Sequence, residues 1–90
     1  MQVRFTAHAE EQIVLRELDP EQVIAVALRP EQTVYSSGRL PIAQSRITHK
    51  GQPALLRVVF ADEDDIRWVI TVYPTSQMGR YWQEESPDEN

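Results

Sequence analysis

Apolar and polar residues alternate most regularly near the end of the chain, where the sequence reads I-R-W-V-I-T-V-Y from Ile66 to Tyr73. A period of two among β-branched and aromatic residues is typical of a β-strand with one buried face. One side of this strand carries Ile66, Trp68, Ile70 and Val72, and the other carries Arg67, Val69, Thr71 and Tyr73. We therefore expect a strand whose second face presents a cation, a hydroxyl and a phenol.

The first third of the chain has the wider apolar spacing of amphipathic helices. Thr6 is a suitable N-cap for a first helix over Ala7–Glu17. Asp19 at a second N-cap, Pro20 at the first helical position and Gln22 at the third form a capping-box pattern. We expect two short helices joined as a helical hairpin.

The remaining apolar segments have the period of strands. The candidates are Gln2–Thr6, Thr33–Ser36, Ile42–His49, Ala54–Ala61, Ile66–Tyr73 and, after a loop, Arg80–Trp82. Lys50-Gly51 and the acidic run Asp62–Asp65 are expected turns between consecutive strands. These elements predict an α+β fold in which the helical hairpin packs on one face of a three- to five-stranded antiparallel sheet.

Length and composition indicate the domain organisation and the location of the protein. The chain has 90 residues, which predicts a single domain, over residues 1–82. Residues 83–90 contain four acids and no base, and we expect a disordered acidic tail there. There is no cysteine and no apolar run long enough to cross a bilayer, so we expect a cytoplasmic protein without membrane contact.

Charge is distributed unevenly along the chain. The net charge is −5, but the segment from Thr33 to Trp82 holds six of the nine basic residues and only four acids. Strand alternation places Arg57 on the side opposite Leu56, together with the polar residues of the last strand. We expect the exposed face of the sheet to be basic and able to bind an anionic partner.

The residue types on this face suit RNA. Cleavage of RNA without a metal needs a base for the 2′-hydroxyl, cations for the phosphorane and an acid for the leaving oxygen. The catalytic candidates are His8, Arg57, Thr71 and Tyr73, and the RNA-binding candidates are Arg46, Arg67, Arg80 and Tyr81. The structural alternatives are a histidine bonded to a backbone group and a solvated sheet face that binds nothing.

The sequence predicts no metal or cofactor site. Four consecutive acids at Asp62–Asp65 rarely converge on one ion, and a solvated turn explains them better. His49 has no second histidine at metal-ligand spacing.

Three short motifs resemble a known family. Phe5-Thr6-x-His8-Ala9, Glu21-x-Val23 and Ile70-Thr71-Val72-Tyr73 are similar to a family of small bacterial proteins called domain of unknown function 4258 (DUF4258), over roughly Phe5–Trp82. That family is thought to be related to the RelE/ParE-like toxins and other metal-independent ribonucleases. The resemblance implies a RelE/ParE-like fold with His8 and the polar strand residues at the active site.

The chain departs from the family pattern at two places. Gln12 stands where the family has an arginine, and Leu18-Asp19-Pro20 replaces a glycine before the second helix. The leading hypothesis is a toxin-like, RNA-directed protein, a metal-independent endoribonuclease of RelE/ParE-like type, with RNA and an antitoxin-like protein as partners. The alternative, favoured by Gln12 and the acidic net charge, is a non-catalytic module that binds another protein.

Overall fold

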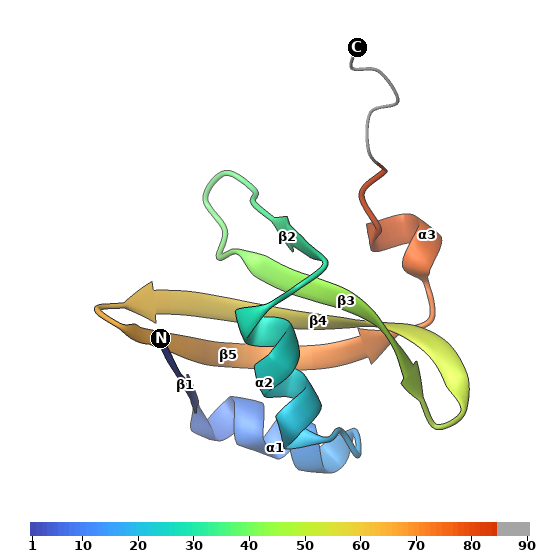
Figure 1. Ribbon diagram of the computed structural model, residues 1–90, viewed down its shortest axis with the longest axis horizontal. Helices are drawn as coiled ribbons and strands as arrows, with labels where there is room; N and C mark the ends of the chain where they lie inside the picture. Colours follow the sequence, from blue (N-terminus) through green and yellow to red (C-terminus); the bar gives the residue numbers. More distant parts are fainter. Residues whose placement is uncertain (85–90) are drawn as a thin grey trace.

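The computed structural model describes residues 1–84 and has an α+β fold. The elements are β1 (Gln2–Phe5), α1 (Ala7–Leu15), α2 (Pro20–Leu28), β2 (Gln32–Val34), β3 (Ile42–His49), β4 (Gln52–Glu63), β5 (Ile66–Thr75) and α3 (Met78–Tyr81). A five-stranded sheet carries α1 and α2 on one face, and α3 lies beyond the end of β5 (Figure 1). From Glu85 on, the expected acidic tail lies outside the described residues. No helix within residues 1–84 is long and apolar enough to cross a membrane.

The sheet is mixed, with strand order β1-β5-β4-β3-β2. The pairs β2–β3, β3–β4 and β4–β5 are antiparallel, as expected, but β1 pairs with β5 in parallel. The expectation of a fully antiparallel sheet is therefore wrong at this edge. The direction of β1 could not be predicted, because both helices follow it before the next strand and no hairpin turn fixes its partner.

Both helices begin where the sequence predicts. The hydroxyl of Thr6 accepts a bond from the Ala9 amide at 3.0 Å, and Asp19 Oδ1 accepts one from the Glu21 amide at 3.0 Å. The first helix ends at Leu15, earlier than expected, because Glu17 adopts a left-handed conformation with φ of 56°. A non-glycine residue in this conformation costs roughly 1 kcal/mol.

The apolar core lies between the helices and the sheet. Leu56, Val58 and Phe60 of β4 face the helices, as predicted. The members of the core are Ala9, Ile13, Leu18, Val23, Val26, Ala27, Ala43, Leu56, Val58, Phe60, Val69 and Val72. Each is less than 9% exposed, so this face of the sheet is shielded from water along most of its length.

The simple alternation predicted for β5 is wrong, because the strand contains a β-bulge. Val59 pairs with Thr71 and Phe60 pairs with Val69, which leaves Ile70 as an extra residue. Val69 and Val72 consequently both reach the core, although they are three residues apart.

The end of the chain also differs from expectation. The segment predicted as a short strand at Arg80–Trp82 forms a helical turn, α3, after which Gln83 makes two hydrogen bonds to Gln32 of β2. We call residues 77–84 the C-terminal segment. It lies against the second face of the sheet, where Tyr81 and Trp82 stack on arginines of β4 and β3. The face expected to be open is therefore partly covered.

Candidate functional site

The junction between β1 and α1 brings His8 to strand β5. The amide of Thr6 donates to the Val69 carbonyl at 3.1 Å, and the Thr6 hydroxyl donates to the Ile70 carbonyl at 3.0 Å. These bonds fix the start of α1 beside the bulge. His8, which is exposed, then places its Nε2 atom 3.1 Å from the Thr71 hydroxyl oxygen. Which of the two groups donates depends on the histidine tautomer.

A second polar pair lies on the same face of β5. Arg57 and Tyr73 are in register, and Arg57 Nη1 donates to the Tyr73 hydroxyl at 2.7 Å. Thr71 pairs with Val59, two residues from Arg57, so Thr71 and Tyr73 share this face. Arg57, Thr71 and Tyr73 thus share one face of the sheet, and His8, at the start of α1, contacts Thr71, so the four predicted catalytic residues form two hydrogen-bonded pairs. The two pairs lie side by side, because Thr71 and Tyr73 are consecutive residues on the same face of β5.

Arg57 is not available to a ligand. It is 6% exposed, and its Cζ atom lies 4.2 Å from the centre of the Tyr81 ring. Its Nε atom donates to Gln44 Oε1 at 2.9 Å. Gln44, which is fully buried, donates in turn to Gln32 Oε1 at 2.8 Å and to the Tyr81 carbonyl at 3.1 Å. The expectation that Arg57 lies on an open face is wrong, because the C-terminal segment covers it.

The charge of Arg57 is balanced without a carboxylate. Among residues 1–84 it forms no ion pair, and its neighbours are neutral oxygens and the rings of Tyr73 and Tyr81. An aromatic face attracts a guanidinium by up to about 2 kcal/mol when the contact is desolvated. Within the described chain no buried side-chain nitrogen or oxygen lacks a hydrogen-bond partner. This makes the region a closed polar network.

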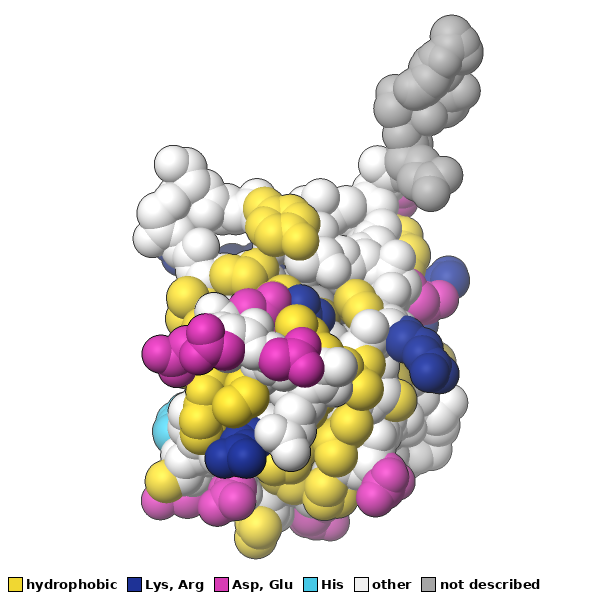
Figure 2. All heavy atoms as spheres, turned by 60° about the vertical axis from the view of Figure 1, so that its left-hand side comes forward, with side chains coloured by type: hydrophobic (Ala, Val, Ile, Leu, Met, Phe, Trp, Pro, Cys, Tyr) yellow, Lys and Arg dark blue, Asp and Glu magenta, His cyan; other side chains and the backbone are white. Residues whose placement is uncertain are grey.

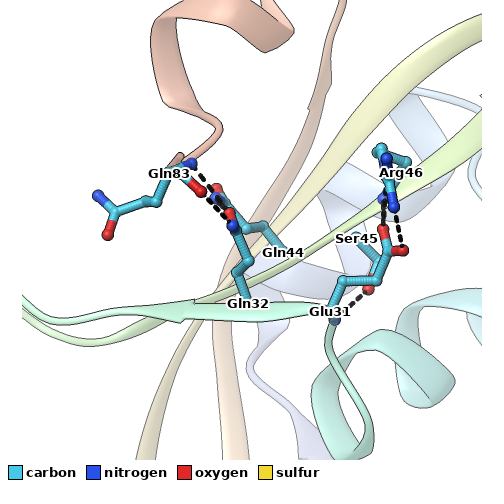
Figure 3. A network of polar contacts seen from close by, with 6 residues as sticks. All are labelled: Glu31, Gln32, Gln44, Ser45, Arg46 and Gln83. Atoms are coloured by element: carbon cyan, nitrogen blue, oxygen red, sulfur yellow. Dashed lines mark hydrogen bonds and ion pairs between the residues drawn. The ribbon is translucent and has the colours of Figure 1, made fainter. Parts of the chain in front are cut away.

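Arg46 is exposed but already paired. Its guanidinium binds both carboxylate oxygens of Glu31, at 3.1 and 2.8 Å, and its backbone amide donates to the same carboxylate at 2.7 Å (Figure 3). These bonds to Arg46 lower the pKa of Glu31 to about 2. The Trp82 ring covers the guanidinium, with its centre 4.5 Å from Arg46 Cζ. Binding a phosphate here would require Arg46 to leave both partners.

Arg67 lies on the other side of the sheet from the site. It binds Asp62 with two hydrogen bonds of 2.7 Å, donates to the Ala27 carbonyl at 2.7 Å, and lies 3.9 Å from the centre of the Phe60 ring. The hydrogen bonds from Arg67 lower the pKa of Asp62. The expectation that Arg67 lies on the same face as Thr71 and Tyr73 is wrong, because the bulge between Val69 and Thr71 interrupts the alternation and Arg67 and Thr71 point to opposite sides of the sheet.

The last two candidates belong to the C-terminal segment. Arg80 is exposed, with its Cζ atom 5.3 Å from the Tyr81 ring centre, and makes no ion pair within residues 1–84. Tyr81 is half-buried and shields Arg57. No group of three potential metal ligands occurs in this part of the chain. On the side of the molecule in Figure 2, arginine and lysine side chains are scattered among acidic and apolar ones.

Sequence reasoning missed the glutamines and the fully buried leucine of this face. Gln32, Gln44 and Gln83 connect β2, β3 and the C-terminal segment (Figure 3). Leu55 is 0% exposed although it points away from the helices. Ile42–His49 has no clean apolar face, and its sequence identifies no partner for Gln44.

Comparison of the chain with protein-family models, with curated proteins and with solved structures found no match. The function is therefore inferred from the geometry of the His8–Thr71 and Arg57–Tyr73 pairs.

Proposed function

We propose that this chain is a toxin-like, RNA-directed protein that cleaves RNA without a metal at the site formed by His8, Thr71 and Tyr73. The observation that supports it is the 3.1 Å contact between His8 and Thr71, which are 63 residues apart in sequence. The imidazole of His8 can serve as the base and the hydroxyl of Tyr73 as the acid that RNA cleavage needs, and the Thr71 hydroxyl can hold the imidazole.

In the proposed reaction His8 removes the proton of an RNA 2′-hydroxyl. The 2′-oxygen attacks the adjacent phosphorus, and the bond from phosphorus to the 5′-oxygen breaks, giving a 2′,3′-cyclic phosphate and a 5′-hydroxyl. Tyr73 gives its proton to the leaving 5′-oxygen, and Thr71 holds the imidazole or a phosphate oxygen. Arg57 acts through Tyr73 as a positioning residue, because it is buried behind that hydroxyl.

Arg80 is the predicted RNA-binding cation best placed to remain available for phosphate. It is exposed at the border of the covered face, whereas Arg46 and Arg67 are each bound to a carboxylate. With few unpaired cations and a net charge of −5, the chain should bind RNA weakly and with a shallow dependence on salt.

The test is cleavage of a short single-stranded RNA by the purified chain in the presence of a chelator. His8→Ala should lower the rate by about 10²–10⁴-fold, the usual contribution of a general base. His49→Ala replaces the other histidine of the chain and is the matched control. Equal cleavage by the His8→Ala variant, or intact RNA with the unchanged protein, would contradict the proposal.

A second candidate function is a non-catalytic protein-interaction module. The specific observation in its favour is that three of the expected phosphate ligands, Arg46, Arg57 and Arg67, already have protein partners. Gln12, at the family's arginine position, accepts a bond from Arg16 at 2.7 Å on the exposed side of α1. Intact RNA together with specific capture of a protein would select this function over cleavage.

A further inference from the structure

The outer edge of β3 is covered by a neighbouring strand over only part of its length. β2 pairs with three residues of β3, the last of which is Gln44, whereas β3 continues to His49. At Arg46 a side chain takes the place of the missing strand, because the Arg46 amide donates to Glu31 (Figure 3). Beyond this point β3 has no neighbour on its outer side within the described residues.

From Arg46 onward, the backbone groups of alternate β3 residues point away from β4 toward the open edge. In an antiparallel ladder, alternate residues direct their N–H and C=O groups to opposite neighbours. The Arg46 amide points away from β4, as its bond to Glu31 shows, so the groups of Thr48 point the same way. Thr48 is in register with Pro53, which has no N–H to offer, in agreement with this direction. The Arg46 carbonyl and both backbone groups of Thr48 therefore form a free strand edge.

A groove runs beside this edge on the helix-covered side of the sheet. It has a volume of about 390 Å³ and lies between α2 and β3. Its apolar lining is contributed by Ala25, Val26 and Leu28 of α2 and by Ile47 of β3. Leu28 is 41% exposed, so an apolar side chain seated here would remove existing apolar surface from water.

The two charged residues that line the groove are both basic. Arg29 and Arg46 line it, and none of its lining residues is acidic. Arg46 is paired with Glu31, but Arg29 makes no ion pair among residues 1–84. A carboxylate on a bound segment would therefore meet at least one unpaired guanidinium.

We propose that the outer edge of β3 is the docking site for an extended, acidic segment of a partner protein. The segment adds to the five-stranded sheet through the backbone groups of Arg46 and Thr48, places one apolar side chain in the groove and directs a carboxylate to Arg29. This specifies the partner for the second candidate function. It does not depend on cleavage, because β3 is separated from β5 and His8 by β4.

The probe is a synthetic capped peptide of alternating glutamate and valine, titrated into the isotope-labelled full chain and followed by backbone amide NMR. We expect the amides of residues 45–49 and of the end of α2 to shift. A peptide with the same side chains but N-methylated on alternate amides should bind about tenfold more weakly, since it cannot pair with the edge. Shifts centred on β5 or α1, or equal binding of the methylated peptide, would overturn the proposal.

Two pairs of protein variants make the test residue-specific. Thr48→Pro removes the outward amide and should weaken binding by about tenfold, whereas Thr48→Val keeps that amide and should bind normally. Arg29→Glu should weaken binding by about fivefold, while Arg39→Glu makes the same charge change in a distant loop and should have no effect. If Thr48→Pro does not fold, the methylated peptide decides the question with the unchanged protein.

Two further outcomes would also overturn the proposal. Equal binding of a lysine–valine peptide would show that the site does not select an acidic partner. Concentration-dependent dimerisation that Thr48→Pro abolishes would assign the edge to a second copy of this chain.

Discussion

Both faces of the sheet bury side chains, but the first is shielded from water along most of its length and the second only in part. The first face is covered by α1 and α2, each of nine residues and each capped by a side chain, over an almost wholly aliphatic core. The second is covered by the C-terminal segment, whose α3 has four residues and no side-chain cap. Arg57 and Gln44 lie beneath it, and Leu55 is fully buried on the same face of the sheet. Low exposure therefore does not mean the same stability on the two faces.

The helices and the C-terminal segment would lose different interactions if they moved away from the sheet. Lifting a helix exposes aliphatic surface worth roughly 25 cal/mol per Å², whereas lifting the C-terminal segment exchanges hydrogen bonds and ring contacts for water. We therefore expect the C-terminal segment to open at a lower free energy than the helices.

The largest effect should come from a pair of adjacent leucines. Leu56 and Leu55 are both 0% exposed, but Leu56 faces the helices and Leu55 the opposite side. We expect Leu56→Ala to lower the free energy of unfolding by about 3–4 kcal/mol and Leu55→Ala by about 2 kcal/mol, because the short segment can close over the smaller side chain. Urea denaturation measures both values, and equal losses would contradict the contrast between the faces.

The next effect concerns the buried cation. Arg57→Ala should cost about 2–3 kcal/mol, because it leaves the Gln44 and Tyr73 oxygens without their donor. Arg57→Met fills more of the volume without a charge and should recover part of this loss. Thermal unfolding of the two variants compares them, and a methionine variant no more stable than the alanine variant would show that lost volume does not account for the loss of stability.

The smallest effect is a pH dependence at the border of the covered face. Glu31 has a pKa of about 2 in the folded chain, against 4.5 for the free group. Its ionised form therefore stabilises the fold above about pH 4.5, and this contribution is lost as the pH falls toward 2. The side chain is 40% exposed, so the contribution is small.

Glu31→Gln should therefore melt slightly below the unchanged protein at pH 6, and the difference should vanish near pH 2. Arg46→Met removes the partner of Glu31 and is the control. Adding Glu31→Gln to it should change the melting temperature little at either pH. A difference that persists near pH 2 would exclude ionisation of Glu31 as its cause.

The sequence predicts the parts of the fold that local chemistry decides. The caps at Thr6 and Asp19 and the turn at Lys50-Gly51 were placed correctly, because each depends on a few neighbouring residues. The direction of β1 and the extra residue Ile70 depend on pairing between distant segments, and no local pattern records them.

The candidate site also combines features that local sequence predicts with features that depend on distant segments. The shared face of Arg57, Thr71 and Tyr73 follows from strand alternation on the two sides of a turn. The covering of Arg57 could not be predicted, because Arg80–Trp82 reads as a strand and nothing in it indicates that Tyr81 returns to β4.

The hydroxyl of Thr6 accepts a bond from α1 and donates one to β5, and the Thr6 amide donates a second bond to β5, so a single residue fastens the helix to the sheet at one end. Thr6 is therefore the fixed point about which α1 would rock. His8 lies about 3 Å from it along the helix axis, whereas Leu15, at the other end, lies about 13 Å away. Any rocking of α1 about Thr6 is thus amplified roughly fourfold at Leu15 relative to His8. A molecule that pulled on the exposed end of α1 at Val14 and Leu15 would therefore move Leu15 about four times as far as His8.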